Sequence, residues 1–266
     1  MKTFFLTVVT LFLIHSCNQK SSGNKAIILV NISEINAENP SFVIDSVKID
    51  DSIQVSKTLQ LHTYNKVLLF PSIQNKSVLD SIYHRAGVVL NHYSKEEILK
   101  ELTKQKEAYF SQAKEDSKEY MPDFEQTWEE NSYMKMIAHR NNMLTLTYEN
   151  DGYSGGAHGY YTIFYKNFDL NNNQTLQLSD VFTDVQKVNW NAILMKHFKN
   201  KDQKEMLLVD KIPVNNNFYY SDKAITFVYN QYEITAYAAG VVEIEVPFTE
   251  LKPYLKPDFI KRNNIK

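Results

Sequence analysis

The glycines of this chain are concentrated in one short segment. Four of the seven glycines in the 266 residues lie between Gly152 and Gly159, in the stretch Gly-Tyr-Ser-Gly-Gly-Ala-His-Gly. Glycine is needed where φ is positive or where another group approaches the backbone closely. A strand pattern precedes this stretch, and an alternating pattern over residues 160–168 follows it. The sequence therefore predicts a sharp turn between two strands.

The first half of the chain combines strand patterns with helix patterns. Alternation of apolar and polar residues predicts a half-exposed strand over residues 53–61, and a short apolar strand follows at 66–70. Apolar residues at helical spacing predict a helix over 77–90. A capping box opens a second helix that runs over about 94–118, with one apolar stripe and one charged face. This second helix should therefore lie on a surface.

The second half returns mostly to strand patterns. A hairpin signal at residues 140–142 separates two strands, and a helical region begins at Ser179. This order of elements predicts an α+β fold with a mostly antiparallel sheet and long helices packed on one face. The predicted strands are 133–138, 143–148, 160–168, 218–220, 224–229 and 241–246, and a short last helix is predicted at 247–251.

The N-terminus has the features of a bacterial lipoprotein signal. A positive start is followed by an apolar run over residues 3–14, which is too short to span a bilayer as a helix. The only cysteine of the chain, Cys17, follows a small residue directly after this run. We expect residues 1–16 to be a signal peptide and residues 17–43 to be a lipidated tether and lead-in. The alternative is a secreted protein cleaved near residue 17.

Lipidation at Cys17 predicts attachment to the membrane through the lipid anchor, in the bacterial cell envelope. Asn18 is not the aspartate that retains lipoproteins at the inner membrane, which favours the outer membrane or a periplasm-facing position. The whole chain has 29 basic and 31 acidic residues. This near balance argues against a nucleic acid partner.

Two ordered blocks of residues resemble a family of bacterial envelope domains. The family includes the extracellular sensor region of the anti-sigma factor RsiV and the non-catalytic N-terminal region of the peptidoglycan deacetylase PdaC. The resemblance divides the body into a PdaC-like half, 44–166, and an RsiV-like half, 167–256, which we expect to form one compact unit. The residues that carry it are 153–159, 167–170, 176–182, 217–219, Phe227, 232–234, 236–240, 246–248 and Leu251.

This resemblance implies a binding or sensor module rather than an enzyme. The ligand would be a protein such as lysozyme or a peptidoglycan-related glycan. We see no cytoplasmic anti-sigma segment and no deacetylase catalytic domain, so we expect a non-catalytic protein. Two other hypotheses stay open, which are a hydrolase or deacetylase-associated enzyme acting on cell-wall polymers, and a structural envelope lipoprotein.

The chemical candidates in the glycine-rich stretch are His158 and Ser154. Ser154 fits a G-x-S-x-G pattern, but a nucleophile elbow requires a helix after the serine, and a strand pattern follows here. No histidine pair has zinc-ligand spacing on one helix face and no second cysteine is present, so we expect no metal and no cofactor. His158 is a candidate ligand contact, although a bond to nearby backbone is the simpler interpretation.

The candidate binding residues form two groups. The ligand-binding candidates in and beside the glycine-rich stretch are Tyr153, Gly155, Gly156, His158 and Tyr160. Tyr237 is a further candidate in the separate small-residue segment 232–240, which is either a core loop or a ligand platform. A lysozyme-like partner is cationic and would require an acidic face. The candidates for that face are Glu119, Asp123, Glu125, Glu129 and Glu130. Two of Glu125, Glu129 and Glu130 could also act as an acid–base pair on a glycan, but acidic clusters of this kind are usually solvated.

Overall fold

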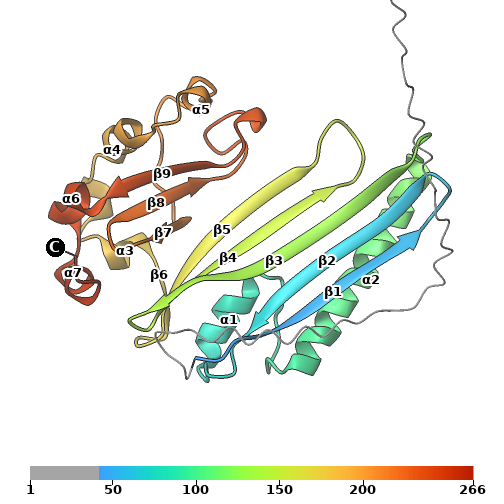
Figure 1. Ribbon diagram of the computed structural model, residues 1–266, viewed down its shortest axis with the longest axis horizontal. Helices are drawn as coiled ribbons and strands as arrows, with labels where there is room; N and C mark the ends of the chain where they lie inside the picture. The colour runs from blue at the N-terminus through green and yellow to red at the C-terminus, as the bar shows by residue number, and fades with distance from the viewer. Residues whose placement is uncertain (1–41, 266) are drawn as a thin grey trace, which may run out of the picture.

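The computed structural model describes residues 42–265, which form two β-sheets with helices packed against them (Figure 1). The larger sheet has six strands in the order β1-β2-β3-β4-β5-β6, and the smaller has three in the order β7-β8-β9. All neighbouring strands are antiparallel except β2 and β3. The predicted α+β class with a mostly antiparallel sheet is confirmed. The predicted signal peptide, Cys17 and the tether up to residue 41 lie outside the described residues.

The elements have the following bounds. The strands are β1 (Asp45–Gln54), β2 (Leu59–Leu69), β3 (Gln126–Arg140), β4 (Met143–Tyr153), β5 (Tyr160–Asp169), β6 (Gln174–Leu176), β7 (Phe218–Tyr220), β8 (Ala224–Tyr229) and β9 (Val242–Pro247). The helices are α1 (Lys76–His84), α2 (Lys95–Glu119), α3 (Leu178–Val181), η1 (Val185–Lys187), α4 (Trp190–His197), α5 (Lys201–Glu205), η2 (Tyr237–Ala239), α6 (Phe248–Leu251), η3 (Lys252–Tyr254) and α7 (Pro257–Arg262).

The predicted single strand over residues 53–61 is wrong, because a turn divides it into the ends of β1 and β2. The Ser56 hydroxyl oxygen accepts hydrogen bonds from the backbone N–H groups of Thr58 and Leu59, both at 3.1 Å. The apolar alternation continues across this turn and hides it. β2 then pairs in parallel with β3, and a parallel pair needs a long crossover connection. That crossover contains α1 and α2.

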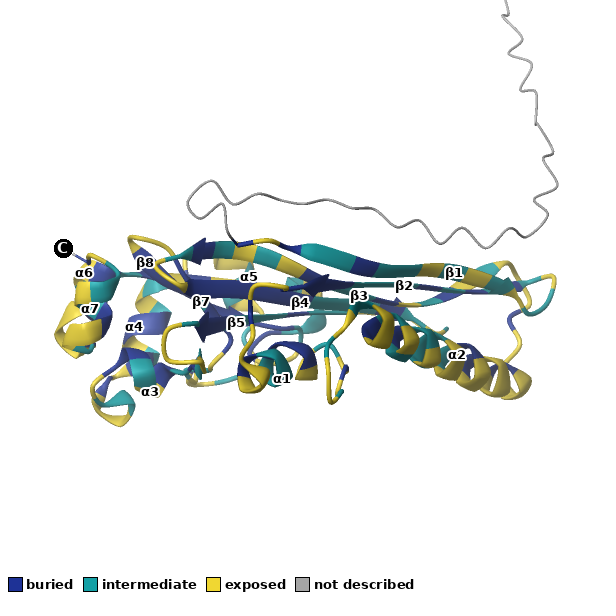
Figure 2. Ribbon diagram, turned by 90° about the horizontal axis from the view of Figure 1, so that it is seen from below, coloured by how far each residue is buried: buried dark blue, intermediate teal, exposed yellow. Residues whose placement is uncertain are grey.

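Both helices of the crossover lie on the same face of the large sheet, as predicted (Figure 2). The helix α2 begins where the capping box predicted, because the Ser94 side chain accepts from the N–H of Glu97 at 3.2 Å. The helix α1 is shorter than predicted. Its N-cap is Asn75, and it ends at His84, ahead of Gly87, which has a φ of +71°.

We call the sheet face beneath these helices the covered face. Successive side chains of a strand point to opposite faces, so alternate residues of each strand enter this core. Leu59 and Leu61 are fully buried there, against Phe110 of α2 and Trp128 of β3. Complete burial of such a side chain contributes about 1.5–3 kcal/mol. A larger cluster joins Val67, Ile82, Ile98, Leu102, Met134, Leu144, Leu146 and Phe168 nearby.

The hairpin between β3 and β4 forms at the predicted residues. Asn141 and Asn142 both have positive φ, at 51° and 56°. Two consecutive positive φ values match the twist of a tight hairpin turn, and asparagine tolerates them. The later strands β7, β8 and β9 and the helix α6 also occupy predicted segments. The boundary between the two predicted halves, at residues 166 and 167, falls inside β5.

The small sheet is attached to the edge of β5 by side-chain amides. Asn217 accepts from the N–H of Tyr165 at 2.7 Å and donates to the carbonyl of Ile163 at 2.9 Å. Asn230 accepts from the N–H of Ile163 at 2.7 Å, and Gln231 accepts from the N–H of Tyr161 at 3.2 Å. These amides replace a strand partner along the part of β5 that β6 does not reach, so the two sheets lie side by side (Figure 1).

Candidate functional site

The glycine-rich turn after β4 requires glycine for the reasons expected. Gly155 and Gly156 have φ values of +89° and +90°. A Cβ atom on Gly152 would lie 2.6 Å from the carbonyl oxygen of Glu129, and one on Gly159 would lie 2.5 Å from the carbonyl oxygen of Gly152. Strands β4 and β5 flank the turn, so the backbone doubles back with almost no space between its two sides.

His158 and Tyr237 are brought together by this turn. Their rings stack with centroids 3.9 Å apart. The Tyr237 hydroxyl donates to the carbonyl of Gly159 at 2.9 Å, and His158 Nδ1 lies 2.9 Å from the same oxygen. His158 is thus bonded to nearby backbone and joins the turn to η2 beside the small sheet. No helix follows Ser154, because β5 begins at Tyr160.

The other candidates around the turn are divided between two places. The Tyr153 hydroxyl donates to the carbonyl of Gly156 at 3.1 Å, and Gly155 lies against the ring of Trp128. Tyr160 points to the covered face, where burial and the charge of Glu130 raise its pKa. Trp128 also belongs to the covered face, so Gly155 and Tyr160 both lie toward the covered side, whereas His158 stacks on Tyr237 of η2.

The five acidic candidates do not share one surface. Glu119 is the last residue of α2, and Asp123 and Glu125 follow it in the connection to β3. Glu129 and Glu130 are consecutive in β3, so their side chains point to opposite faces of the sheet. Glu130 lies on the covered side, where burial raises its pKa. Of the five, Glu129 alone has the strand position that faces away from the helices.

The face of the large sheet opposite α1 and α2 carries a row of tyrosines, and we call it the open face. Figure 2 shows both helices on the other side of the sheet. Tyr64 of β2 and Tyr133 of β3 stack with centroids 5.1 Å apart. Tyr165 of β5 and Tyr219 of β7 are 4.5 Å apart, so the row continues onto the small sheet. The tyrosines of the open face are Tyr64, Tyr133, Tyr161, Tyr165 and Tyr219, each partly exposed.

The charged residues of the open face are mostly acidic. Its carboxylates are Asp50, Glu129, Glu149, Asp151, Glu243 and Glu245, and its lysines are Lys48, Lys66 and Lys135. Lys135 bonds Glu149 at 2.8 Å and Lys48 lies 3.4 Å from Asp50. The carboxylates of Glu243 and Glu245 are left without a salt bridge among the described residues. The open face therefore carries an excess of negative charge.

Burial and the nearby carboxylates raise the pKa values of the open-face tyrosines. Burial, then Glu149, raises the pKa of Tyr161 to about 12, and Glu243 contributes to the same shift. Burial and the carboxylate of Asp151 likewise raise the pKa of Tyr133. Tyrosine is already neutral near neutral pH, so these phenols act there as hydrogen-bond donors, and the shifts extend the neutral form to higher pH. A surface of neutral donors among carboxylates is suited to binding cationic and polar groups.

Residues 42–265 hold no arrangement typical of metal chemistry or of a membrane span. No group of three His, Cys, Asp or Glu side chains in this range could hold a metal ion. No helix in the same range is long and apolar enough to cross a membrane. The open face offers binding groups instead.

Of the open-face residues, the sequence candidates included only Glu129. The alternation Tyr161-Ile163-Tyr165 was the available signal for the tyrosines, but alternation does not tell which face of a sheet the helices cover.

Two family models match this chain. Residues 59–161 match the family described as deacetylase PdaC, and residues 179–249 match a protein family of unknown function, DUF3298. The chain belongs to the RsiV- and PdaC-like domain family. The two matches divide the fold: the first covers β2 to the start of β5, and the second covers α3 to α6.

Solved structures share this fold. A member of the DUF3298 family from Bacteroides fragilis NCTC 9343 is 20% identical, with a TM-score of 0.71 over 85% of this chain and 98% of that one. A DUF3298 family protein from Pseudomonas aeruginosa PAO1 is 17% identical, with a TM-score of 0.52 over 81% of this chain and 96% of that one. No curated protein sequence matches this chain significantly.

Proposed function

We propose that this protein is a lipid-anchored binding protein of the bacterial cell envelope whose open face recognises a cationic protein of the lysozyme type. The observation that carries the proposal is the two stacked tyrosine pairs, Tyr64–Tyr133 and Tyr165–Tyr219, on a sheet face that neither α1 nor α2 covers. Glu149 on β4 lies between the two pairs, and carboxylates outnumber lysines on this face. The family resemblance supports a binding module, because it is to the extracellular sensor region of RsiV and the non-catalytic N-terminal region of PdaC.

The chemistry of the open face suits a basic protein surface. Tyrosine supplies a large and rigid contact area with a polar tip, and it is enriched in protein interfaces. Carboxylates such as Glu243 and Glu245 attract lysine and arginine side chains and accelerate the encounter. The aromatic rings would also stack on sugars, so a peptidoglycan fragment is the ligand to compare.

Catalysis finds less support than binding. His158 is bonded to the backbone of Gly159, with no carboxylate within hydrogen-bonding distance among the described residues. Glu129 and Glu130, which could have formed an acid–base pair, lie on opposite faces of β3. A hydrolytic site needs groups that converge on one reacting atom, and the turn supplies none.

Calorimetric titration of the purified protein with lysozyme, and then with soluble muropeptides, tests this proposal. We expect micromolar or tighter binding of lysozyme that weakens with added salt, because exposed charges are screened. Muropeptide binding without lysozyme binding would replace the protein ligand by a glycan. Release of a cleaved or deacetylated muropeptide would contradict the binding role and favour an enzyme.

The lipid anchor is tested separately at Cys17. Cells that express the protein are labelled with a clickable palmitate analogue, and the label on the protein is measured. We expect labelling of the wild-type chain and none of the Cys17→Ser variant. Loss of the variant from the membrane fraction should accompany loss of label. A labelled Cys17→Ser variant would overturn the lipoprotein assignment.

A further inference from the structure

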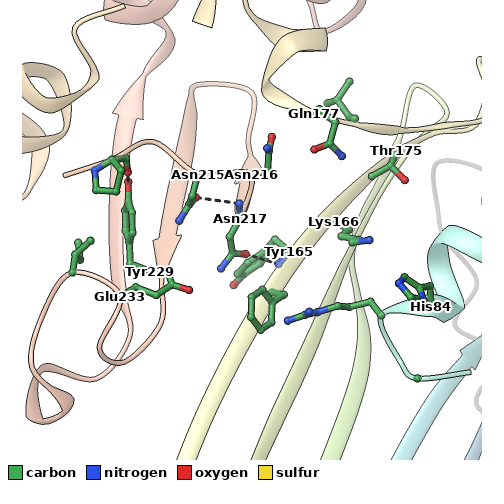
Figure 3. A pocket seen from close by; sticks show the side chains of 16 residues that line it. His84, Tyr165, Lys166, Thr175, Gln177, Asn215, Asn216, Asn217, Tyr229 and Glu233 are labelled. Atoms are coloured by element: carbon green, nitrogen blue, oxygen red, sulfur yellow. Dashed lines mark hydrogen bonds between the residues drawn. The ribbon is translucent and has the colours of Figure 1, made fainter. Parts of the chain in front are cut away.

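A groove of about 960 Å³ lies on the covered side of the large sheet, where α1 ends and the small sheet begins. Its walls come from four places far apart in the sequence. These are the end of α1, the strands β5 and β6, the segment 213–217 before β7, and the segment that follows β8. Figure 3 shows Lys166 of β5 between His84 at the end of α1 and Asn217 before β7.

Arg85 is the first cation of this groove. Its guanidinium carbon lies 3.4 Å from the centre of the Phe164 ring, so the planar group is stacked and held in place. Burial lowers the pKa of Arg85, which means that the groove removes part of its water. No carboxylate forms a salt bridge with Arg85 in the described part of the chain. The Phe164 ring therefore fixes the orientation of the guanidinium, while its N–H groups have no acceptor among the described residues.

Lys166 is the second cation. Burial, and then repulsion by Arg85, lower the pKa of its ammonium group. Within residues 42–265, no salt bridge or hydrogen bond reaches the Lys166 side chain. Two cations that repel each other in a partly desolvated groove destabilise the fold unless an anion joins them. Lys135 and Arg262, by contrast, each have a carboxylate partner.

The remaining wall supplies neutral polar groups and one acid. The side-chain oxygen of Asn216 accepts from the N–H of Leu178 at 2.9 Å, which leaves its amide N–H groups without an acceptor among the described residues. Thr175 adds a hydroxyl that is bonded to Ser81 at 2.5 Å. Glu233 lines the far wall, and the Asn230 amide donates to it at 3.4 Å. The groove is thus cationic on its α1 and β5 side and polar elsewhere.

We infer that this groove is a binding site for a small ligand that carries a carboxylate or phosphate group, held between Arg85 and Lys166. A guanidinium binds such an oxyanion in a bidentate manner, and an ammonium adds a point charge. The volume is within the range of small-molecule sites. Tyr165 of the open face also lines the groove, but Arg85 and Lys166 lie on the covered side of the sheet, away from the open-face carboxylates, so the two sites can be tested separately.

Calorimetric titration of the purified protein with inorganic phosphate, and separately with succinate, tests the inference. We expect at least one probe to bind with a Kd below about 10 mM at low ionic strength. Arg85→Gln and Lys166→Gln should each weaken this binding at least tenfold, whereas Lys66→Gln, which removes a lysine from the open face, should not change it. The tighter of the two probes distinguishes a phosphate ligand from a carboxylate ligand.

Three results would overturn the inference. The first is no binding of either probe up to that concentration, and the second is equal binding by the wild type and both groove variants. The third is an equal loss in the Lys66→Gln control, which would indicate general charge screening. Thermal unfolding of each variant shows that it is folded. Lysozyme titration in saturating probe is compared with the same titration in sodium chloride of equal ionic strength, which accounts for charge screening. It separates this site from the proposed function, because the two should not compete beyond that screening.

Discussion

The two faces of the six-stranded sheet are made by the same strands and differ in almost every respect. On the covered face, Leu59, Leu61 and Trp128 exclude water against α2. On the open face, their strand neighbours include His62 and Glu129, which lie 3.8 Å apart and are partly exposed. Because side chains alternate along each strand, the residues of the covered face form the core that stabilises the fold. The residues of the open face are not needed for that core, and five tyrosines lie there.

The contrast also explains the five tyrosines of the open face, out of 17 in the chain. A buried leucine is needed where a helix covers the sheet. A tyrosine can cover backbone and keep its hydroxyl in water, so it suits a face without a helix. The stacked pairs Tyr64–Tyr133 and Tyr165–Tyr219 widen the aromatic surface across several strands. If this view is right, substitutions on the two faces should affect different properties.

The largest expected effect is on the covered face. Leu61→Ala should lower the free energy of unfolding by about 2–5 kcal/mol, because it leaves a cavity at a fully buried site. The adjacent His62→Ala on the open face is the matched control. It removes only exposed ionic contacts to Asp50 and Glu129, which are worth about 0–1 kcal/mol. Urea denaturation of both variants measures the difference, and equal losses would remove the distinction between the faces.

The junction of the two sheets should give the next largest effect. Asn217→Ala deletes both bonds to the β5 backbone and leaves the N–H of Tyr165 without its acceptor, whereas the carbonyl of Ile163 keeps its bond from Asn230 at 3.1 Å. Each unsatisfied group costs about 1–3 kcal/mol. Gln231→Ala removes a single, longer bond of 3.2 Å and should cost less. Amide hydrogen exchange along β5 would show the same order, and a larger loss for Gln231→Ala would mean that these amides do not hold the edge.

A smaller effect is expected from acid. Burial raises the pKa of Asp169, but its hydrogen bonds from Arg262 and from the N–H groups of Asn171 and Asn172 outweigh burial and lower it. A lowered folded-state pKa gives stability that is present above the unfolded value of about 3.9 and is lost as pH falls below it. Wild-type stability should therefore fall between about pH 5 and about pH 3.

The Asp169→Asn variant is the control for this acid dependence. It lacks the titrating group, so its urea midpoint should change less over the same pH interval, although it is less stable at neutral pH. An unchanged acid dependence in the variant would assign the effect to other carboxylates. Asp169 has the strand position of the open face but is buried beneath Arg262 of α7, so it marks where the open face ends.

The smallest expected effect has the opposite sign. Lys166→Met should raise stability by up to about 1 kcal/mol, because it removes a partly desolvated ammonium that Arg85 repels and keeps the apolar stem. Lys66→Met, on the open face of β2, should leave the melting temperature nearly unchanged. Thermal denaturation compares the two, and a destabilised Lys166→Met variant would mean that the ammonium has a partner in the folded protein.

The sequence predicted those elements whose ends are set by neighbouring residues, such as a helix cap or a tight turn. The capping box at Ser94 predicted α2, and the Asn141-Asn142 pair predicted the β3–β4 hairpin. The turn at residues 56–58 has neither glycine nor proline, and the apolar pattern runs through it, so it was missed. The end of α1 at His84 was missed because helical spacing continues to Leu90 after the backbone has left the helix.

The candidate sites depended on contacts that no local pattern contains. The stacking of His158 on Tyr237 needs η2 to reach the β4–β5 turn, and the sequence placed both residues in one group through family resemblance. Strand alternation places Glu129 and Glu130 on opposite faces of the sheet. The sequence did not predict this, because its strand was expected to begin at residue 133, whereas β3 begins at Gln126. Arg85 and Lys166 meet only because α1 packs beneath β5, and nothing near either residue predicts this.

The most direct test of the central claim is a charge reversal on each side of the sheet. Glu243→Lys changes the open face beside Tyr165 and Tyr219, and Glu107→Lys changes an exposed position on α2 beneath the covered face. Calorimetric titration with lysozyme is performed on both variants. We predict that Glu243→Lys weakens binding at least tenfold and that Glu107→Lys binds like the wild type. Equal binding by both variants, or a greater loss in Glu107→Lys, would contradict the assignment of the open face as the binding surface.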